Sequence, residues 1–195
     1  MSRHVDKLTA GLASLAHPTP LRPRDTLVCV TYTVRPARTP DVPRIRSLVS
    51  PLVDRRILLG KELVALYEAV QEFRVVEDES GELIGCGALH VMWQDLGEVR
   101  TLAVADEWLH RGVGHAILES IEDHASSLGL TRLFCLTFET AFFSRHGFEP
   151  IGEDIVAPEV YAELVRSQDE GVAEFLDLSR VKPNTLGNTR MLKQL

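Results

Sequence analysis

The fold of this chain is decided by one stretch, EVRTLAVADEWLHRGVGHA, which covers residues 98–116. Its first part, residues 98–104, predicts a β-strand, and a short polar connection then leads to Gly112-Val113-Gly114, where a helix begins. Glycines let a backbone approach an oxyanion closely, and the first free N–H groups of a helix point at it. The stretch therefore predicts an anion-binding turn, with tight packing of the helix start as the alternative reason for the two glycines.

Basic side chains accompany the two glycines. Arg111 precedes the turn, and His110 and His115 lie on either side of it. Such side chains strengthen an anion site because charge-assisted hydrogen bonds are stronger than neutral ones. The predicted site consists of His110, Arg111, Gly112, Val113, Gly114 and His115.

Two common phosphate-binding folds do not fit this turn. A dinucleotide-binding fold needs Gly or Ala at the position of Ile117. It also needs repeated βαβ units, whereas an antiparallel meander is expected before the turn. A Walker loop is excluded because no Gly-Lys-Ser/Thr follows the glycines.

The apolar pattern outside the turn predicts an α+β domain. Short polar turns at residues 78–81 and 94–97 connect three strands into a meander, and one helix crosses over to a continuous apolar strand. The first helix is expected to end before Pro51. We take residues 27–195 as the folded domain and residues 1–26 as a flexible leader. Strands are expected at residues 27–34, 73–77, 83–92, 98–104, 132–137, 148–151 and 188–193, and helices at 41–50, 61–71, 112–128, 139–145 and after Pro158.

The composition narrows the class of protein. A net charge of −7 argues against general nucleic-acid binding but leaves room for an anionic small molecule. No apolar run is long enough to span a membrane, and the lack of an unbroken apolar stretch in residues 1–25 argues against a secretory signal. Cys29, Cys86 and Cys135 lie far apart in apolar stretches without metal-ligand spacing. We expect buried, reduced thiols, no metal and a cytoplasmic location.

The turn resembles that of the GNAT superfamily of acetyl-CoA-dependent acyltransferases. That family carries Gln/Arg-x-x-Gly-x-Gly/Ala after its fourth strand, and Gly112 and Gly114 match the two small positions. Leu109 departs from the pattern, so the resemblance places the binding mainly on backbone amides. The block FFSRHGF at residues 142–148 is similar to the family's FYxxxGF. The resemblance implies the GNAT fold, a mixed central sheet flanked by helices, with acetyl-CoA as co-substrate.

Residues 41–195 are also similar to the short, stand-alone actinobacterial form of N-acetylglutamate synthase. The similarity implies transfer of acetyl from acetyl-CoA to the α-amino group of L-glutamate or L-glutamine, the first step of arginine biosynthesis. The kinase-like domain through which longer synthases assemble has no room in this chain, which leaves a homodimer open. The segments that carry the similarity are LYEAVQEF, GCGALHV, LTFETAFFSRHGF, GVAEFLDLS and VKPNTLGNTRML.

The resemblance also implies catalytic roles. Glu98 lies where many relatives keep a carboxylate that acts as general base through a water, the alternative being a strand-end Glu in solvent. Leu102, Ala103 and Val104 would offer backbone groups to the pantetheine arm and the thioester oxygen. Phe143 stands where many relatives have a Tyr that protonates the leaving thiolate, so that role is vacant.

The amino-acid acceptor requires at least one cation for its carboxylate. Lys61 lies where the longer synthases carry an Arg, and His90 where some relatives have Lys. The remaining candidates are Lys182, Asn188 and Arg190. Rival functions are acetylation of a protein N-terminus or another amine, a non-catalytic acyl-CoA sensor and, more remotely, a dinucleotide-binding oxidoreductase.

Overall fold

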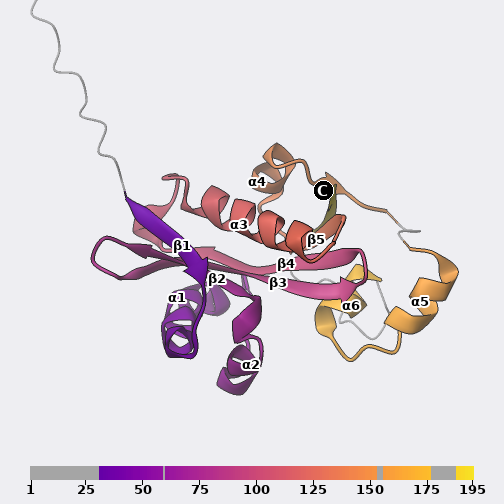
Figure 1. Ribbon diagram of the computed structural model, residues 1–195, viewed down its shortest axis with the longest axis horizontal. Coiled ribbons are helices and arrows are strands. Elements are labelled where there is room, and N and C mark those ends of the chain that lie inside the picture. Colours follow the sequence, from indigo (N-terminus) through magenta and orange to yellow (C-terminus); the bar gives the residue numbers. More distant parts are fainter. Residues whose placement is uncertain (1–30, 59, 153–155, 177–187) are drawn as a thin grey trace, which may run out of the picture.

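A single mixed sheet forms the centre of the computed structural model, which describes residues 31–58, 60–152, 156–176 and 188–195 (Figure 1). Its strand order is β1-β2-β3-β4-β5-β7-β6. β4 and β5 are parallel, and the other neighbours are antiparallel. The strands are β1 (Tyr32–Pro36), β2 (Phe73–Asp78), β3 (Leu83–Trp93), β4 (Leu96–Val104), β5 (Arg132–Thr137), β6 (Glu149–Pro150) and β7 (Thr189–Gln194).

Helices cover both faces of the sheet (Figure 1). α3 and α4 lie on one face and α1 and α2 on the other, while α5 and α6 lie at the end where β3 turns into β4. The helices are α1 (Val42–Asp54), α2 (Leu63–Glu68), α3 (Val113–Ser127), α4 (Thr140–Arg145), α5 (Pro158–Leu164) and α6 (Glu170–Phe175), with short 3-10 turns η1 (Thr39–Asp41), η2 (Val70–Glu72) and η3 (Asp106–Trp108).

α3 packs closely on β3 because glycines remove side chains beneath it. Ile117 and Ile121 are fully buried on this face. A Cβ at Gly87 would come within 2.7 Å of Ile117 Cγ2, and one at Gly85 within 2.9 Å of Ile117 Cδ1. Such distances are shorter than van der Waals contact, so the two glycines fix how near the helix lies to the sheet.

Two further apolar clusters hold the rest of the molecule. α1 and α2 bury Val42, Ile45 and Leu66 on the face opposite α3. At the end of the sheet, Phe175 of α6 packs edge-on against Phe134 of β5, with ring centroids 5.1 Å apart. Burial of aromatic rings of this size contributes strongly to stability, so α6 is an integral part of the core.

The predicted α+β class, the mixed central sheet flanked by helices and the order of elements as far as α5 are confirmed. One boundary was wrong: α1 runs through Pro51 to Asp54. Pro51 is exposed, so the hydrogen bond that it cannot donate is lost on the solvent side, while Leu52 beyond it packs against the core. The helix expected at residues 61–71 is shorter, because a 3-10 turn at Val70–Glu72 ends it.

The sequence analysis missed α6. Asp169 caps its start, since Asp169 Oδ1 accepts the N–H of Val172 at 3.0 Å. The strand expected at 27–34 is observed at Tyr32–Pro36, and residues 1–30 lie outside the described part. Among the described residues no helix is long and apolar enough to cross a membrane. Cys86 and Cys135 are buried free thiols, as predicted, and Cys29 lies outside the described residues.

Candidate functional site

A bulge in β4 separates the two halves of the candidate site. Cys86 pairs with Ala103, and Ala88 pairs with Arg100. Between these two pairs β4 contains one more residue than β3, which is the definition of a β-bulge. Thr101, inside the bulge, has a φ of +56°. This left-handed conformation is unusual for a β-branched residue, and it bends the strand where β4 approaches the helices.

β4 also parts from β5 beyond the bulge. Their pairing ends at Val99 and Cys135, although β4 continues to Val104. The N–H of Ala105 donates to Ile84 of β3 at 2.9 Å. Because backbone groups alternate along a strand, the preceding residue Val104 directs its own N–H and C=O away from β3, towards the side where β5 no longer pairs. This edge offers backbone hydrogen bonds to an extended ligand.

The predicted anion turn comes shortly after the end of β4 in the chain, between η3 and α3. Gly112 caps α3 with a φ of +83°, and His110 also lies in the left-handed region at +61°. The first N–H of the helix that bonds inside it is that of Ala116, which donates to the Gly112 carbonyl at 3.0 Å. The amides of residues 113–115 precede it, and a helix supplies no internal acceptor for them. The geometry is therefore suited to an anion.

Side chains around the turn differ in what they can add. Leu109 is 47% exposed and carries no donor, so the backbone amides must do most of the binding. Arg111 stacks over the Trp108 ring at 5.3 Å. His115 Nδ1 lies 3.4 Å from His146 Nε2, at the end of α4. Burial lowers the pKa of His146, and His115 lowers it further.

The opposite half of β4 carries a buried ionic cluster. Glu98 is only 7% exposed, which excludes a strand-end Glu in solvent. Its Oε2 accepts hydrogen bonds from Arg100 Nη2 at 2.6 Å and from Nε at 2.9 Å. Arg100 also donates to Asp169 Oδ1 at 2.8 Å and to Oδ2 at 3.2 Å. Burial raises the pKa of Glu98, and the charge and hydrogen bonds of Arg100 offset part of that rise.

His90 extends this cluster across the sheet. It lies directly opposite Glu98 in the β3–β4 register. His90 Nδ1 lies 2.7 Å from Glu72 Oε1, and Nε2 lies 3.7 Å from Asp169 Oδ2. The other oxygen of Glu72, Oε2, is buried without a partner among the described residues. An unpaired buried acceptor of this kind is a place where a donor from a ligand would be stabilised.

Lys61 lies in a cavity beside the cluster. The cavity has a volume of about 280 Å³ and lies between α1, the start of α2 and Thr101 of the β4 bulge. Burial lowers the pKa of Lys61, and the nearby charge of Arg100 lowers it further. The cavity therefore brings an ammonium group to the same bulge that separates the two halves of β4.

The structure thus brings only some of the predicted catalytic and substrate-binding residues together. Glu98, His90 and Lys61 lie in or beside one cluster, whereas Arg190 on β7 donates to the Phe175 carbonyl at 3.2 Å and holds the end of α6. Asn188 directly precedes β7, and Lys182 lies outside the described residues. Ala103 packs its side chain into the core.

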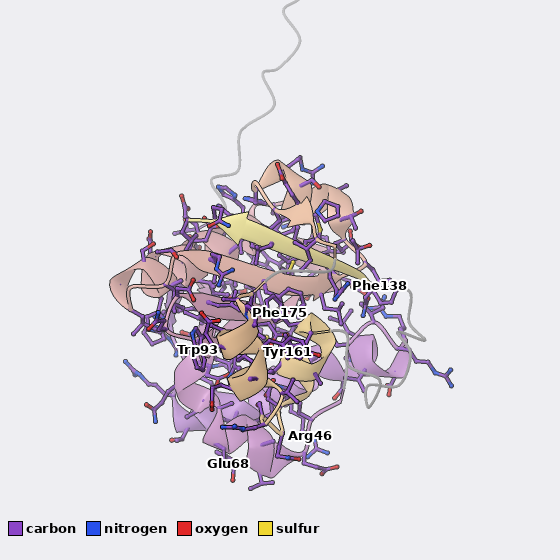
Figure 2. The ribbon with its side chains drawn as sticks, turned by 90° about the vertical axis from the view of Figure 1, so that its right-hand side faces the viewer. Arg46, Glu68, Trp93, Phe138, Tyr161 and Phe175 are labelled. Atoms are coloured by element: carbon purple, nitrogen blue, oxygen red, sulfur yellow. The ribbon has the colours of Figure 1, made fainter. Side chains whose placement is uncertain are left out.

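Three members of the cluster were not foreseen: Glu72, Arg100 and Asp169. Arg100 could have been found, because residues two apart on a strand share a face and Glu98 was already a candidate. Asp169 arrives from a distant segment that leaves no mark in the local pattern. Figure 2 looks onto the end of the molecule that α5 and α6 cover, with Phe175 near its centre.

Comparisons with known proteins give consistent matches. Residues 50–148 match the acetyltransferase (GNAT) family. An amino-acid acetyltransferase of Mycobacterium tuberculosis is 56% identical over 173 residues, which cover 88% of this chain and 97% of that protein. An amino-acid acetyltransferase of Pseudomonas putida is 40% identical over 121 residues, 61% of this chain, and the match spans only 28% of that longer relative.

Solved structures show the same likeness. The crystal structure of Rv2747 from Mycobacterium tuberculosis, in complex with CoA, superposes with a TM-score of 0.77 at 56% identity, over 84% of this chain and 99% of that one. N-acetylglutamate synthase from Neisseria gonorrhoeae, complexed with coenzyme A and N-acetyl-glutamate, has a TM-score of 0.68 at 28% identity. That match covers 85% of this chain and 35% of the other.

Proposed function

Because this chain belongs to the acetyltransferase (GNAT) family, we propose that it transfers acetyl from acetyl-CoA to the α-amino group of an amino acid, L-glutamate or L-glutamine. This reaction is the first step of arginine biosynthesis. The observation that carries the proposal is the arrangement along β4: an anion turn follows one end, a buried carboxylate lies at the other, and an unpaired edge runs between them.

The residues present fit acetyl-CoA. Gly112 and Gly114 leave the backbone open to a pyrophosphate, and a Cβ on Gly114 would meet Phe142 and Val104 at 3.6 to 3.7 Å. The amides of Arg111, Val113 and His115 and the side chain of His110 are proposed to contact the same pyrophosphate. Leu102 and Val104 would offer backbone groups to the pantetheine arm, and Ala103 would contribute through its backbone only.

Acetyl-CoA supplies an activated acyl carbon, and the residues of this chain position the amine that attacks it. The new C–N bond forms as the C–S bond breaks, and the amine loses a proton. Glu98 is the proposed acceptor of that proton, through a water molecule. Its raised pKa makes it a stronger base than an ordinary carboxylate. Phe143 is 5% exposed and packs edge-on against Phe148 at 5.1 Å, so it serves the core.

Lys61 is the proposed contact for a carboxylate of the acceptor. It shares the 280 Å³ cavity with the β4 bulge, whereas Arg100 is already held by two carboxylates. His90 is proposed to contact the other end of the substrate, and Asn188, Arg190 and Lys182 remain proposals from the sequence. The free thiols Cys86 and Cys135 support a cytoplasmic location.

A CoA-release assay tests the function. We expect the purified chain to release CoA from acetyl-CoA with glutamate or glutamine and not with a panel of peptides. Release with peptides alone would overturn the proposed acceptor, and tight acetyl-CoA binding without turnover would identify a sensor.

Lys61→Ala tests the pocket. We expect KM for the amino acid to rise by about 10-fold or more, because a charge-assisted contact is lost, while KM for acetyl-CoA stays within about twofold. Arg56→Ala, which removes an exposed cation from the same connection, is the matched control and should leave both constants unchanged. Equal increases of both constants in Lys61→Ala would remove Lys61 from the pocket.

A further inference from the structure

One guanidinium joins the proposed base to a segment that lies far away in the sequence. Arg100 lies between Glu98, two residues before it, and Asp169, 69 residues after it. Its side chain is 14% exposed and Glu98's 9%, so both ends of the first pair are removed from water. Asp169 is 27% exposed and lies at the outer side of the row. The row carboxylate–guanidinium–carboxylate leaves Arg100 little freedom to turn.

Asp169 is fixed by its own segment. Its N–H donates to Ser167 Oγ at 3.1 Å, and its Oδ1 accepts the N–H of Val172 at 3.0 Å. α6 then continues to Phe175, which is fully buried against Phe134. The Asp169 carboxylate, which accepts hydrogen bonds from Arg100, is therefore anchored to the core through α6.

The first turn of α6 also covers Glu98. A Cβ at Gly171 would overlap Glu98 Oε2 and would lie 2.8 Å from Arg100 Nη2. Only a residue without a side chain fits over the ion pair at this position. The burial of Glu98 thus depends on α6 as well as on the sheet.

Asp169 also influences Glu98 electrostatically, in addition to seating α6 over it. A buried carboxylate with a guanidinium to itself is strongly stabilised in its charged form and is a weak base. Asp169 takes two hydrogen bonds of Arg100 and adds a negative charge, and both effects keep the pKa of Glu98 higher. Among the residues that the structure describes, the other charged or titratable groups coupled to Glu98 are His90 on β3, Lys61 before α2 and the Cys135 thiol on β5.

We propose that Asp169 is a positioning residue: it holds Arg100 so that the guanidinium fixes the Glu98 carboxylate, and it seats the first turn of α6 over that carboxylate. The inference rests on the proposed function in one respect, the role of Glu98 as base. The arrangement itself is independent of the acceptor.

Asp169→Asn is the primary test. Asparagine caps helices as well as aspartate does, so α6 keeps its start, but one of the two charges that hold Arg100 is gone. We expect kcat to fall about 10- to 100-fold, as when a reacting group loses its support, with KM for acetyl-CoA unchanged. The acid limb of the pH profile of kcat/KM should move to lower pH, because a negative charge beside Glu98 has been removed.

Two further variants make the result decisive. Glu163→Gln removes a carboxylate from the neighbouring α5, where Glu163 forms an exposed pair with Arg166, and should leave kcat and the pH profile unchanged. Gly171→Ala keeps every charge, but its new Cβ would displace the Glu98 carboxylate. This variant should therefore lower kcat although Asp169 is intact. A parent-like kcat in Asp169→Asn, or a lower kcat with an unmoved acid limb, would overturn the proposal.

An infrared titration of the Glu98 carboxyl separates this proposal from the proposed function. The signal is the difference between the parent and Glu98→Gln, and it needs no substrate. Glu98 should ionise at lower pH in Asp169→Asn than in the parent, and an identical titration would overturn the positioning role. A fully active Glu98→Gln would instead overturn the proposed base.

Discussion

Gly112 and Gly114 of the anion turn should respond in opposite ways to alanine. Gly112 has a φ of +83°, where an L side chain costs about 1–2 kcal/mol. Its new Cβ would also lie 3.3 Å from the Tyr32 hydroxyl, a contact that forces the ring to shift. Gly112→Ala should therefore lower the free energy of unfolding by about 1–2 kcal/mol.

Gly114→Ala is the matched control. Gly114 lies inside α3, and its new Cβ would meet Phe142 and Val104 at 3.6 to 3.7 Å, which is ordinary contact. Alanine is also favoured over glycine within a helix by about 0.5–1 kcal/mol. We expect unchanged or slightly increased stability, and a smaller effect on acetyl-CoA binding than in Gly112→Ala.

Urea and thermal unfolding of both variants measure the difference. In a chain of this size each kcal/mol shifts Tm by about 2–4 °C, so Gly112→Ala should melt clearly below Gly114→Ala. Because its amides would turn away from the ligand, KM for acetyl-CoA should rise in Gly112→Ala as well. Parent-like stability of Gly112→Ala, or a larger loss in Gly114→Ala, would refute the reasoning from backbone conformation.

Three other predictions concern charge. Glu98→Gln should lower kcat about 10²- to 10⁴-fold. In the parent, kcat/KM should begin to fall on the acid side at a pH above the ordinary carboxylate range, because burial raises the pKa of Glu98. A parent kcat/KM that stays constant until the pH reaches the ordinary carboxylate range would contradict this prediction. CoA should bind more tightly at about pH 6 than at pH 8 in calorimetry. His146 lies 3.4 Å from His115 of the anion turn, so a phosphate bound at the turn would favour the proton on His146 that burial and His115 disfavour. His146→Gln should weaken this dependence, and a pH-independent parent would count against it. Asp41→Asn should reduce the free energy of unfolding by about 2 kcal/mol at pH 7. Hydrogen bonds from Arg35 lower the pKa of Asp41 to about 2, so ionised Asp41 stabilises the fold above the unfolded value of about 3.9. The gap between parent and variant should therefore close as the pH falls from about 4 towards 2 in acid unfolding, and a gap that persists would refute the pairing.

Local sequence patterns were sufficient to predict the elements that have a periodic apolar pattern or a short turn signal. The apolar period of residues 113–125 and the stop at Gly129 define α3, and the short polar turns define the meander. The glycine turn could be located because positive φ and close approach favour glycine. These features depend on neighbours within a few residues, which the sequence displays directly.

The missing parts depend on contacts between distant segments. α6 is only six residues long, and its stability comes from Phe175 packing on Phe134, which no local pattern reveals. Asp169 belongs to the site only because α6 seats it beside Arg100. The passage of α1 through Pro51 likewise depends on which side of the helix meets solvent.

The identity of the transferred group and its acceptor is the central claim, and NMR of the product tests it most directly. The chain would be incubated with acetyl-CoA labelled with ¹³C in the acetyl carbonyl and with L-glutamate or L-glutamine. We predict label in an amide on the α-nitrogen of the amino acid, in equal amount to the CoA released, and formation of this product at least about 100-fold more slowly in Glu98→Gln. Label that stays in acetyl-CoA, or that appears only on an amine other than the α-amino group, would contradict the account.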